Sequence, residues 1–496
     1  MDLSQVSGYI KNFPFAAFRE KQSYVLKEIH AAFASGYNHI IVEAPTGFGK
    51  SPVAIATALT LGSSYILTST KNLQTQYVRD FTFVRVAKGK NNFRCEVKDD
   101  FIKNGTFRCK PCGGSGLQSG CHHTSVEYGP CMSDKDFNCK YKTSLKDYQV
   151  IGKGTKEEVS LVEGSYQKAY SEWPHLNNLR EDVIRDWRPC QYFHQLNIAL
   201  TASHSILNYP MFLSLLPATK FHSREILILD EAHLLEEEVV KFAGISISKR
   251  RWRRYIPDLK IVDYGFDDIG NWINFLIDLE TQMLYLPEEV SEELEVEAKT
   301  EREKLTRAID QISSNPKNWL VSEIKKENNE VTRVELKPLD VSPYCNRIFE
   351  KCDKTLMMSA TILDKDAFCT SLGLAPEEIN FIQVPSDFPL QNRPIYRLNT
   401  AYLNTDRLKI EEVQIKIGRA IDNLMTSHRS DKGIIHTTSY RQLDFIKQYT
   451  LCQLLSLSGS TQISNFTTVL PSSCTSLYII ALNPMNLPTL IAGEGW

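Results

Sequence analysis

The sequence predicts an α/β fold with a parallel β-sheet at its centre. Short, almost wholly apolar runs at 39–42, 64–68 and 226–229 are typical of strands that are buried on both faces. Segments of helical periodicity alternate with these runs, and a glycine-rich turn follows the first run. Alternating strands and helices favour a parallel sheet covered by helices on both faces. The 496 residues, 42% of them hydrophobic, are enough for about two to four globular domains.

Composition and charge exclude several classes of protein. The formal net charge is −2, so any affinity for nucleic acid must come from local basic patches. No run approaches the roughly 18 apolar residues of a membrane helix, and no basic segment followed by an apolar run opens the chain. We therefore expect no membrane span and an intracellular protein, nuclear in a eukaryote or cytoplasmic in a prokaryote.

An expected helix at 16–35 precedes the first strand. Its apolar residues share one face at helical spacing, and they are Phe18, Val25, Leu26, Ile29 and Phe33. The run 39–42 predicts a strand that leads directly into the glycine-rich turn. The runs 64–68 and 226–229 predict two further strands of the same sheet.

The glycine-rich turn fits a phosphate-binding loop. The eight residues after the first strand match the Walker A pattern, with Ala in place of its first Gly, and they are Ala44, Pro45, Thr46, Gly47, Phe48, Gly49, Lys50 and Ser51. Backbone N–H groups of such a loop surround phosphate oxygens at the positive end of the next helix. Lys50 would reach the β- and γ-phosphates, and Ser51 would hold Mg²⁺. The pattern predicts ATP and Mg²⁺ as ligands; the alternative is a glycine turn with a chance lysine.

An acidic motif, Asp230-Glu231-Ala232-His233, directly follows the third apolar run. A carboxylate at the carboxyl end of a buried parallel strand, beside the strand that feeds the phosphate loop, can bind Mg²⁺, and we assign this role to Asp230. Glu231 would orient and deprotonate the attacking water. His233 would connect the nucleotide site to the nucleic-acid side. The alternative is an ordinary helix N-terminus.

Seven of the twelve cysteines lie between Cys95 and Cys190, where periodicity breaks down. An intracellular chain keeps thiols reduced, so this density indicates a metal rather than disulfides. Cys109 and Cys112 form a chelating pair. Four thiolates can hold either a [4Fe-4S] cluster or Zn²⁺, and spacing alone does not choose between them.

Together the motifs resemble the XPD/DinG family of superfamily 2 iron–sulfur DNA helicases. Arg19 and Gln22 look like the family's Q-motif, which contacts adenine. The segment 68–76 resembles motif Ia, which implies that Thr70 and Gln76 contact the DNA backbone. Met358-Ser359-Ala360-Thr361 resembles motif III, which couples hydrolysis to DNA binding.

The resemblance also implies the cofactor. The spacing of Cys95, Cys109 and Cys112 is similar to that of the family's iron–sulfur domain, and Cys190, before a Tyr-containing segment, would be the fourth ligand of a [4Fe-4S] cluster. Zn²⁺ is the alternative. The further cysteines stay open between buried thiols and ligands of a second site, and they are Cys121, Cys131 and Cys139.

The basic segment 249–254 opens an insertion that resembles the family's helical Arch domain. Five cations surround Trp252 there, which suggests phosphate neutralisation by Arg250 and base stacking on the indole. The alternative is a solvated basic helix whose Trp packs inward. With the iron–sulfur domain, an Arch domain would form a pore for one DNA strand.

The family's second motor domain is expected to be incomplete. Residues 432–440 look like motif IV, but no motif V or VI follows, and Arg441 is the last arginine. From Gln448 to Trp496 only Glu494 is charged, where the chain-wide frequency gives about eleven charges. A frame change, intron read-through or truncation is the leading explanation, and a hydrophobic partner-binding tail is the alternative. The arginine finger of motif VI is worth ~10³–10⁵ in rate, so hydrolysis should be feeble.

The resemblance implies a RecA-like P-loop motor domain with two insertions and an incomplete second RecA-like domain. The expected parts are motor domain 1 at 1–87, 191–245 and 345–385, an iron–sulfur-type insertion at 88–190, an Arch-like insertion at 246–344, a partial motor domain 2 at 386–447 and an anomalous tail at 448–496. The implied function is ATP-dependent, 5′-to-3′ helicase activity on single-stranded or forked DNA, impaired in this chain. The alternatives are a nucleic-acid-binding pseudo-helicase or regulatory subunit, and a zinc-binding ATPase that acts on protein or RNA.

Overall fold

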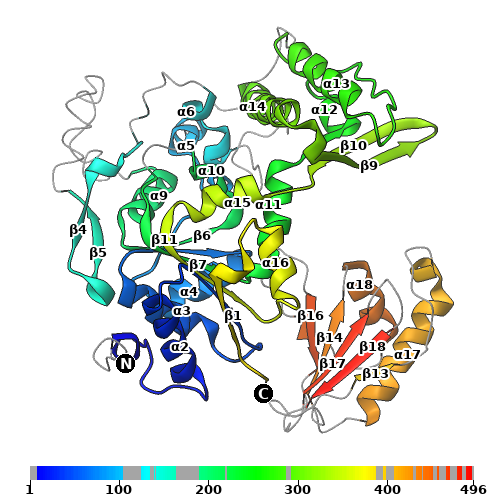
Figure 1. Cartoon of the computed structure of the whole chain (residues 1–496). Coiled ribbons are helices and arrows are strands. Elements are labelled where there is room, and N and C mark those ends of the chain that lie inside the picture. Colours follow the sequence, from blue (N-terminus) through cyan, green and yellow to red (C-terminus); the bar gives the residue numbers. More distant parts are fainter. Residues whose placement is uncertain are drawn as a thin grey trace. The chain divides into compact units, whose positions relative to one another are not determined.

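The computed structural model divides the chain into two compact units, Met1–Val384 and Pro385–Trp496 (Figure 1). The structure describes residues 8–103, 124–133, 139, 141–162, 189–217, 221–285, 292–386, 395–397, 407–427, 432–437, 440–450, 455–456, 465–469, 477–482 and 488–493.

The first unit is built on a seven-stranded sheet with the order β12-β1-β11-β7-β2-β6-β3. Every pair of neighbouring strands in it is parallel. Its strands are β1 (His39–Glu43), β2 (Ser64–Thr68), β3 (Arg85–Val86), β6 (His204–Asn208), β7 (Arg224–Asp230), β11 (Cys352–Ser359) and β12 (Ile379–Gln383). The three apolar runs are therefore strands of one parallel sheet, as predicted.

Helices cover both faces of this sheet. Successive strand residues point to opposite sides, and because the strands are apolar throughout, both sides are buried under helices. Ile40 and Val42 pack with α2 (Gln22–Ala34), α3 (Lys50–Leu61) and α4 (Lys71–Asp80) in one buried cluster. Ile41 packs on the other face, in the cluster that holds α9 (Gln191–Thr201), α10 (Tyr209–Leu215), α11 (Leu235–Ala243), α15 (Ser342–Phe349) and α16 (Lys365–Ser371). Two apolar cores thus hold the sheet rigid.

The helix expected at 16–35 is shorter than predicted. It begins at Gln22 because Lys21, its N-cap, has a left-handed backbone with φ of 64°. A left-handed residue cannot continue a right-handed helix. The preceding residues are consequently free to form a loop against the Walker A turn.

Arg224 connects the sheet to helix α9. Its buried guanidinium donates to the carbonyl oxygens of Ala199 at 3.1 Å and Ala202 at 2.6 Å, at the end of α9. It also donates to the carbonyl oxygen of Ser64 at 2.6 Å and stacks over the Tyr65 ring, 3.9 Å from its centroid. These contacts compensate the burial of the charge, because buried polar groups are stable only when bonded.

The insertion between β3 and α9 consists of short elements. They are η1 (Lys90–Asn92), α5 (Glu96–Lys103), η3 (Val126–Tyr128), α6 (Pro130–Ser133), η4 (Leu145–Asp147), η5 (Gly154–Lys156) and the antiparallel pair β4 (Tyr148–Ile151) and β5 (Glu158–Leu161). Cys109, Cys112 and Cys121 lie outside the described residues.

The second insertion is not purely helical, and that part of the prediction was wrong. It contains a three-stranded antiparallel sheet of β8 (Ile245–Ser248), β10 (Glu330–Pro338) and β9 (Trp319–Glu327). Helices α12 (Lys249–Trp252), α13 (Ile269–Gln282) and α14 (Glu292–Ser314) accompany it. The turn residues Asn328 and Asn329 both have positive φ, at 49° and 64°, which is the backbone of a tight hairpin turn.

The second unit has a six-stranded sheet with the order β13-β18-β17-β14-β16-β15. Only β14 and β17 pair in parallel among its described strands. Its elements are β13 (Ile395–Arg397), η11 (Arg407–Lys409), α17 (Glu411–Ser427), β14 (Lys432–Thr437), α18 (Tyr440–Tyr449), β15 (Leu455–Ser456), β16 (Asn465–Val469), β17 (Leu477–Leu482) and β18 (Pro488–Gly493). The low-charge segment 448–496 therefore contributes four strands. Among the described residues of both units, no helix has the length and apolar character for crossing a membrane.

Candidate nucleotide and nucleic-acid site

The Walker A turn owes its shape to two glycines. Gly47 and Gly49 have φ of 85° and 86°, a left-handed backbone that L side chains rarely adopt. A Cβ at Gly49 would press against Nε2 of Gln22, which would have to move away from the loop. The loop leads straight into α3, whose N-cap is Gly49. The structure thus has a glycine loop and a helix N-terminus at the carboxyl end of a buried strand, where phosphates bind.

Arg19 and Gln22 hold this loop in place. Nε2 of Gln22 donates to the carbonyl oxygens of Phe48 and Gly49 at 3.0 and 3.1 Å, and Nη1 of Arg19 donates to the carbonyl oxygen of Gly47 at 2.5 Å. The amide N–H of Arg19 in turn donates to Oε1 of Gln22 at 2.7 Å. The two residues predicted to contact adenine therefore lie against the loop and fix the orientation of its peptide groups.

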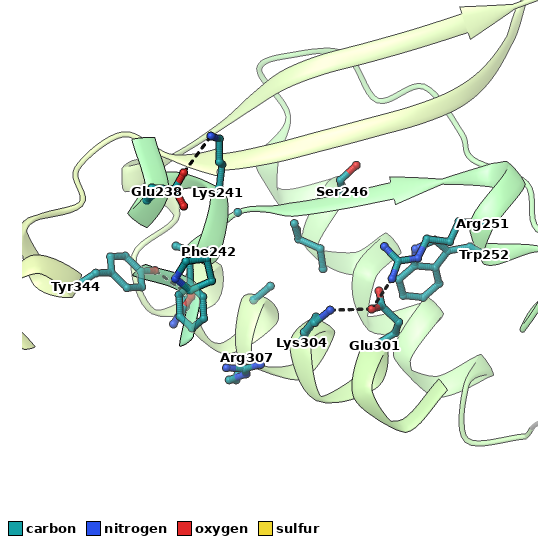
Figure 2. A pocket seen from close by; sticks show the side chains of 16 residues that line it. Glu238, Lys241, Phe242, Ser246, Arg251, Trp252, Glu301, Lys304, Arg307 and Tyr344 are labelled. Atoms are coloured by element: carbon teal, nitrogen blue, oxygen red, sulfur yellow. Dashed lines mark hydrogen bonds and ion pairs between the residues drawn. The ribbon is translucent and has the colours of Figure 1, made fainter. Parts of the chain in front are cut away.

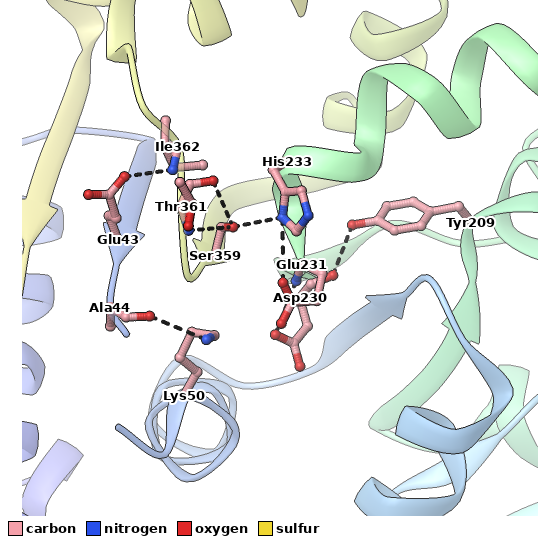
Figure 3. Close-up of polar contacts among 10 residues, drawn as sticks. All are labelled: Glu43, Ala44, Lys50, Tyr209, Asp230, Glu231, His233, Ser359, Thr361 and Ile362. Atoms are coloured by element: carbon pink, nitrogen blue, oxygen red, sulfur yellow. Dashed lines mark hydrogen bonds and ion pairs between the residues drawn. The ribbon is translucent and has the colours of Figure 1, made fainter. Parts of the chain in front are cut away.

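Asp230 lies at the end of β7 on the same edge of the sheet, and Figure 3 shows it facing Lys50. Its side chain is 3% exposed. Burial, followed by the charge of Glu231, raises the pKa of Asp230 to about 6, and the hydrogen bond from Tyr77 and the charge of Lys50 limit the rise. Nζ of Lys50 meanwhile donates to the carbonyl oxygen of Ala44 at 3.3 Å. A buried carboxylate and a nearby ammonium are what a magnesium–phosphate site requires.

Tyr77 is a residue of this site that the sequence did not single out. Its hydroxyl donates to Oδ2 of Asp230 at 2.9 Å, while the amide of Glu231 donates to Oδ1 at 3.1 Å. The hydroxyl of Tyr209 donates to the backbone oxygen of Asp230 at 3.2 Å. Burial, followed by the charge of Asp230, raises the pKa of Tyr77 well above its ordinary value, so the phenol stays protonated and donates. Its neighbour in the sequence, Gln76, is exposed.

His233 and Ser359 connect the acidic motif to the end of β11. Nδ1 of His233 lies 2.7 Å from Oγ of Ser359 and 3.4 Å from Oε2 of Glu231. Oγ of Ser359 also accepts from the amide of Thr361 at 3.2 Å (Figure 3). The structure thus brings together two motifs that lie 126 residues apart in the sequence.

Glu43, the residue before the Walker A segment, is a second contact that the sequence did not reveal. Its carboxylate accepts from the amides of Ile362 at 2.6 Å and Leu363 at 3.3 Å and from Nε2 of Gln383 at 2.8 Å. Burial raises the pKa of Glu43, but these three hydrogen bonds lower it more, so the net shift is downward. Glu43 therefore attaches the loop after Ser359 to the strand that feeds the phosphate loop.

The predicted nucleic-acid residues fall into two groups. Oγ1 of Thr70 caps α4 by accepting from the amide of Leu73 at 3.3 Å, and Gln76 and Arg250 are exposed. Trp252 is 1% exposed and packs in the core of the second insertion. The prediction that bases stack on Trp252 was therefore wrong, and the alternative, an indole that packs inward, describes its place. The indole is needed to fill the core between α12 and the three-stranded sheet.

A pocket of about 410 Å³ lies between α11, β8, α12, α14 and α15 (Figure 2). Two of its basic side chains, Arg251 and Lys304, contact the carboxylate of Glu301, at 2.7 and 2.9 Å. Trp252 forms part of its wall. The cations of this pocket are thus partly neutralised by a carboxylate.

Four cysteines from separate segments gather in the first insertion. Cys95, Cys139 and Cys190 are buried in one cluster, and the half-buried Cys131 packs against it. Burial raises the pKa of Cys95 to about 11 and that of Cys190 to about 12. The hydrogen bond from Cys131 lowers the pKa of Cys139 to about 7.

Four cysteine thiolates are the common ligand set of iron–sulfur clusters. Within the described ranges, however, no group of three or more Cys, His, Asp or Glu side chains has an arrangement that could hold a metal ion. The sulfurs are neighbours without forming a finished ligand shell. Cys109 and Cys112, predicted as ligands, belong to the part of the chain that is not described.

Comparisons with known proteins add the following. The family model of the type III restriction enzyme res subunit matches residues 16–110. No curated protein matches the chain. A solved XPD helicase structure is 14% identical, with 88% of this chain and 75% of that chain covered and a TM-score of 0.45. A truncated XPD is 16% identical over 74% of this chain and 100% of that one, with a TM-score of 0.38. The S. tokodaii Xpd4 structure is 14% identical over 90% and 76%, also with a TM-score of 0.38.

Proposed function

We propose that the chain is an ATP-hydrolysing motor of the XPD/DinG helicase type that acts on DNA. The supporting observation is the meeting of Lys50 and Asp230 at the carboxyl edge of one parallel sheet, beside a glycine loop held by Arg19 and Gln22. In open parallel sheets this edge is where nucleotides bind. The match to the res-subunit family spans the same loop.

The roles of the residues follow from their chemistry. The loop amides and Lys50 bind the phosphates of ATP, and Ser51 and Asp230 hold Mg²⁺. The metal, when bound, neutralises charge that develops on the phosphates. Glu231 orients the attacking water and accepts its proton. The contact of His233 with Ser359 transmits the state of the nucleotide site to the loop after β11.

The DNA substrate and the direction of movement are proposed from the motif resemblance. We assign single-stranded or forked DNA as the partner, 5′-to-3′ translocation, and backbone contacts by Thr70, Gln76 and Arg250. A non-enzymatic nucleic-acid-binding role is the competing function.

One experiment separates the motor from its competitor. We would measure single-turnover ATP hydrolysis with and without single-stranded DNA for wild type, Lys50→Ala and Glu231→Gln. The motor predicts DNA-stimulated hydrolysis in wild type, loss of ATP affinity in Lys50→Ala, and retained affinity with lost hydrolysis in Glu231→Gln. DNA binding without hydrolysis in wild type would establish the non-enzymatic role instead.

We further propose that the first insertion holds a [4Fe-4S] cluster, with Cys95, Cys109, Cys112 and Cys190 as its ligands by the motif resemblance. Cys95 and Cys190 lie in one buried cluster, which supports these two ligands. Cluster insertion would draw the sulfurs together and remove their protons, since metal binding is coupled to both. Cys131 and Cys139 as the middle ligands, and Zn²⁺ as the metal, are the alternatives.

Anaerobic purification of single Cys→Ser variants tests the ligand set. Iron, sulfide and zinc content and visible absorbance would be measured for Cys131→Ser, Cys139→Ser, Cys109→Ser and Cys112→Ser. Cys345→Ser, a buried thiol outside the insertion, is the control. Loss of iron and colour in Cys109→Ser and Cys112→Ser alone supports the proposed set. Loss in Cys131→Ser and Cys139→Ser alone transfers the role to those two residues, and a colourless zinc-containing wild type refutes the cluster.

A further inference from the structure

Tyr77 lies between the two side chains that are proposed to hold Mg²⁺. It is the seventh residue of α4, counted from Lys71, and is 1% exposed. Its hydroxyl donates to Oδ2 of Asp230 at 2.9 Å and lies near the side chain of Ser51. One phenol therefore contacts the end of β7 and lies close to the start of α3.

The contact leaves Asp230 little freedom. Its Oδ1 accepts from the amide of Glu231 at 3.1 Å, so both carboxylate oxygens have a donor from the protein. The Tyr77 ring is itself fixed, because it packs in the core on the α2–α4 face of the sheet and lies 5.8 Å from the ring of Phe81. A rigid ring that orients a buried carboxylate is the arrangement by which outer hydrogen bonds prepare a metal ligand.

The helix that carries Tyr77 has a second connection. Its N-cap is Thr70, and Gln76 lies exposed beside Tyr77 in the sequence. Both are proposed contacts of the DNA backbone. A shift of α4 upon DNA binding would therefore reach Asp230 through a single hydrogen bond.

We propose that Tyr77 is a positioning residue for magnesium: its hydroxyl orients Asp230 toward Ser51, so that the site binds the Mg²⁺–ATP complex better than ATP alone. This inference rests on the proposed ATP-binding function. It assigns no chemical step to Tyr77, which touches neither nucleotide nor water in the proposed reaction.

The test uses the full chain and a fluorescent N-methylanthraniloyl derivative of ATP. Its affinity would be titrated in EDTA and at increasing Mg²⁺ for wild type, Tyr77→Phe and Tyr65→Phe. Tyr65 is the matched control, because it is a buried tyrosine on β2 whose hydroxyl donates to the carbonyl oxygen of His222, away from Asp230. We expect Tyr77→Phe to keep wild-type affinity in EDTA and to need roughly 10-fold or more Mg²⁺, in line with the usual effect of removing such a contact. Tyr65→Phe should behave as wild type.

A double-mutant cycle with Asp230→Asn adds a readout that a merely structural role would not move. Tyr77→Phe should change the Mg²⁺ requirement in the wild-type background and have no further effect beside Asp230→Asn. An unchanged Mg²⁺ titration in Tyr77→Phe, or equal effects in both backgrounds, overturns the inference while the nucleotide site stands. Failure of wild type to bind the ATP derivative at any Mg²⁺ concentration refutes the proposed function itself.

Discussion

The side chain of Gln22 has all of its polar atoms engaged in holding the Walker A turn. Its oxygen accepts from the amide of Arg19, and its nitrogen donates to two loop carbonyls, while the residue is 1% exposed. Removal of a buried hydrogen-bonding group leaves its partners unsatisfied, at about 1–3 kcal/mol. The conformation of the loop therefore depends on this one amide.

We predict that Gln22→Ala weakens ATP binding by roughly 10-fold, which corresponds to about 1.4 kcal/mol. The loop carbonyls lose their donors and the left-handed turn loses its support. Equilibrium binding of the fluorescent ATP derivative measures the effect. The exposed Gln149 supplies the control variant Gln149→Ala, which should bind normally. Equal affinity in both variants would contradict a supporting role for Gln22.

His204 gives a pH dependence of stability. Burial, and next the charge of Arg224, lower the pKa of His204 to about 4, and its Nδ1 lies 2.9 Å from Oγ of Ser64. The imidazole of His204 takes up a proton near pH 6.5 in the unfolded chain and only near pH 4 in the folded chain. Its contribution to the free energy of unfolding is therefore complete above pH 6.5 and is lost as the pH falls toward 4. The total loss is about 3 kcal/mol at 1.36 kcal/mol for each pH unit.

Thermal unfolding at pH 7.5, 6.0 and 5.0 measures this dependence. The melting temperature of wild type should fall with pH, and that of His204→Gln should fall less, because glutamine can accept from Ser64 without taking up a proton. Parallel curves for the two proteins would remove His204 as the cause.

At the scale of elements, the hairpin of β9 and β10 depends on two left-handed residues. Asn328 and Asn329 tolerate positive φ better than most residues, whereas a β-branched side chain does not. We predict that Asn329→Val destabilises the hairpin by about 1–3 kcal/mol and that Asn329→Gly is tolerated. Hydrogen exchange of the β9 and β10 amides should accelerate in the valine variant only.

The elements also show where reasoning from the sequence succeeds. The strands β1, β2 and β7 were predictable because a strand buried on both faces is apolar throughout. The hairpin was missed, although Asn328-Asn329 between two runs of strand-forming residues is a hairpin signal, because the resemblance to a helical Arch domain decided the prediction for the whole of 246–344. The role of Trp252 was misjudged because a basic segment with one aromatic residue has the same sequence pattern whether the ring faces nucleic acid or packs in the core.

The site was only partly predictable for a related reason. Lys50 and Asp230 belong to sequence motifs that are typical of nucleotide binding. Tyr77 and Glu43 act instead through contacts with residues that are 153 and 319 positions away in the sequence. No local pattern marks such residues. Cys131 and Cys139 gave the same difficulty, since only the fold places them beside Cys95.

On the scale of the whole molecule, the contact of His233 with Ser359 should carry the coupling between nucleotide and DNA. We predict that Ser359→Ala keeps ATP affinity and reduces the stimulation of hydrolysis by single-stranded DNA, with about 0.5–2 kcal/mol of coupling lost. Steady-state hydrolysis against DNA concentration measures it. Ser371→Ala, on α16 with its hydroxyl donating to Phe368, is the control. Undiminished stimulation in Ser359→Ala would exclude this route.

Arg224 connects the cysteine-rich insertion to β7, the strand that ends at Asp230. Helix α9 has Cys190 as its N-cap. The guanidinium of Arg224, the first residue of β7, donates to a carbonyl oxygen at the end of α9, and the last residue of β7 is Asp230. Helix α9 and strand β7 thus connect the Cys190 thiol to the Asp230 carboxylate. Oxidation of the thiols should therefore accelerate amide hydrogen exchange along β7, even in the absence of nucleotide.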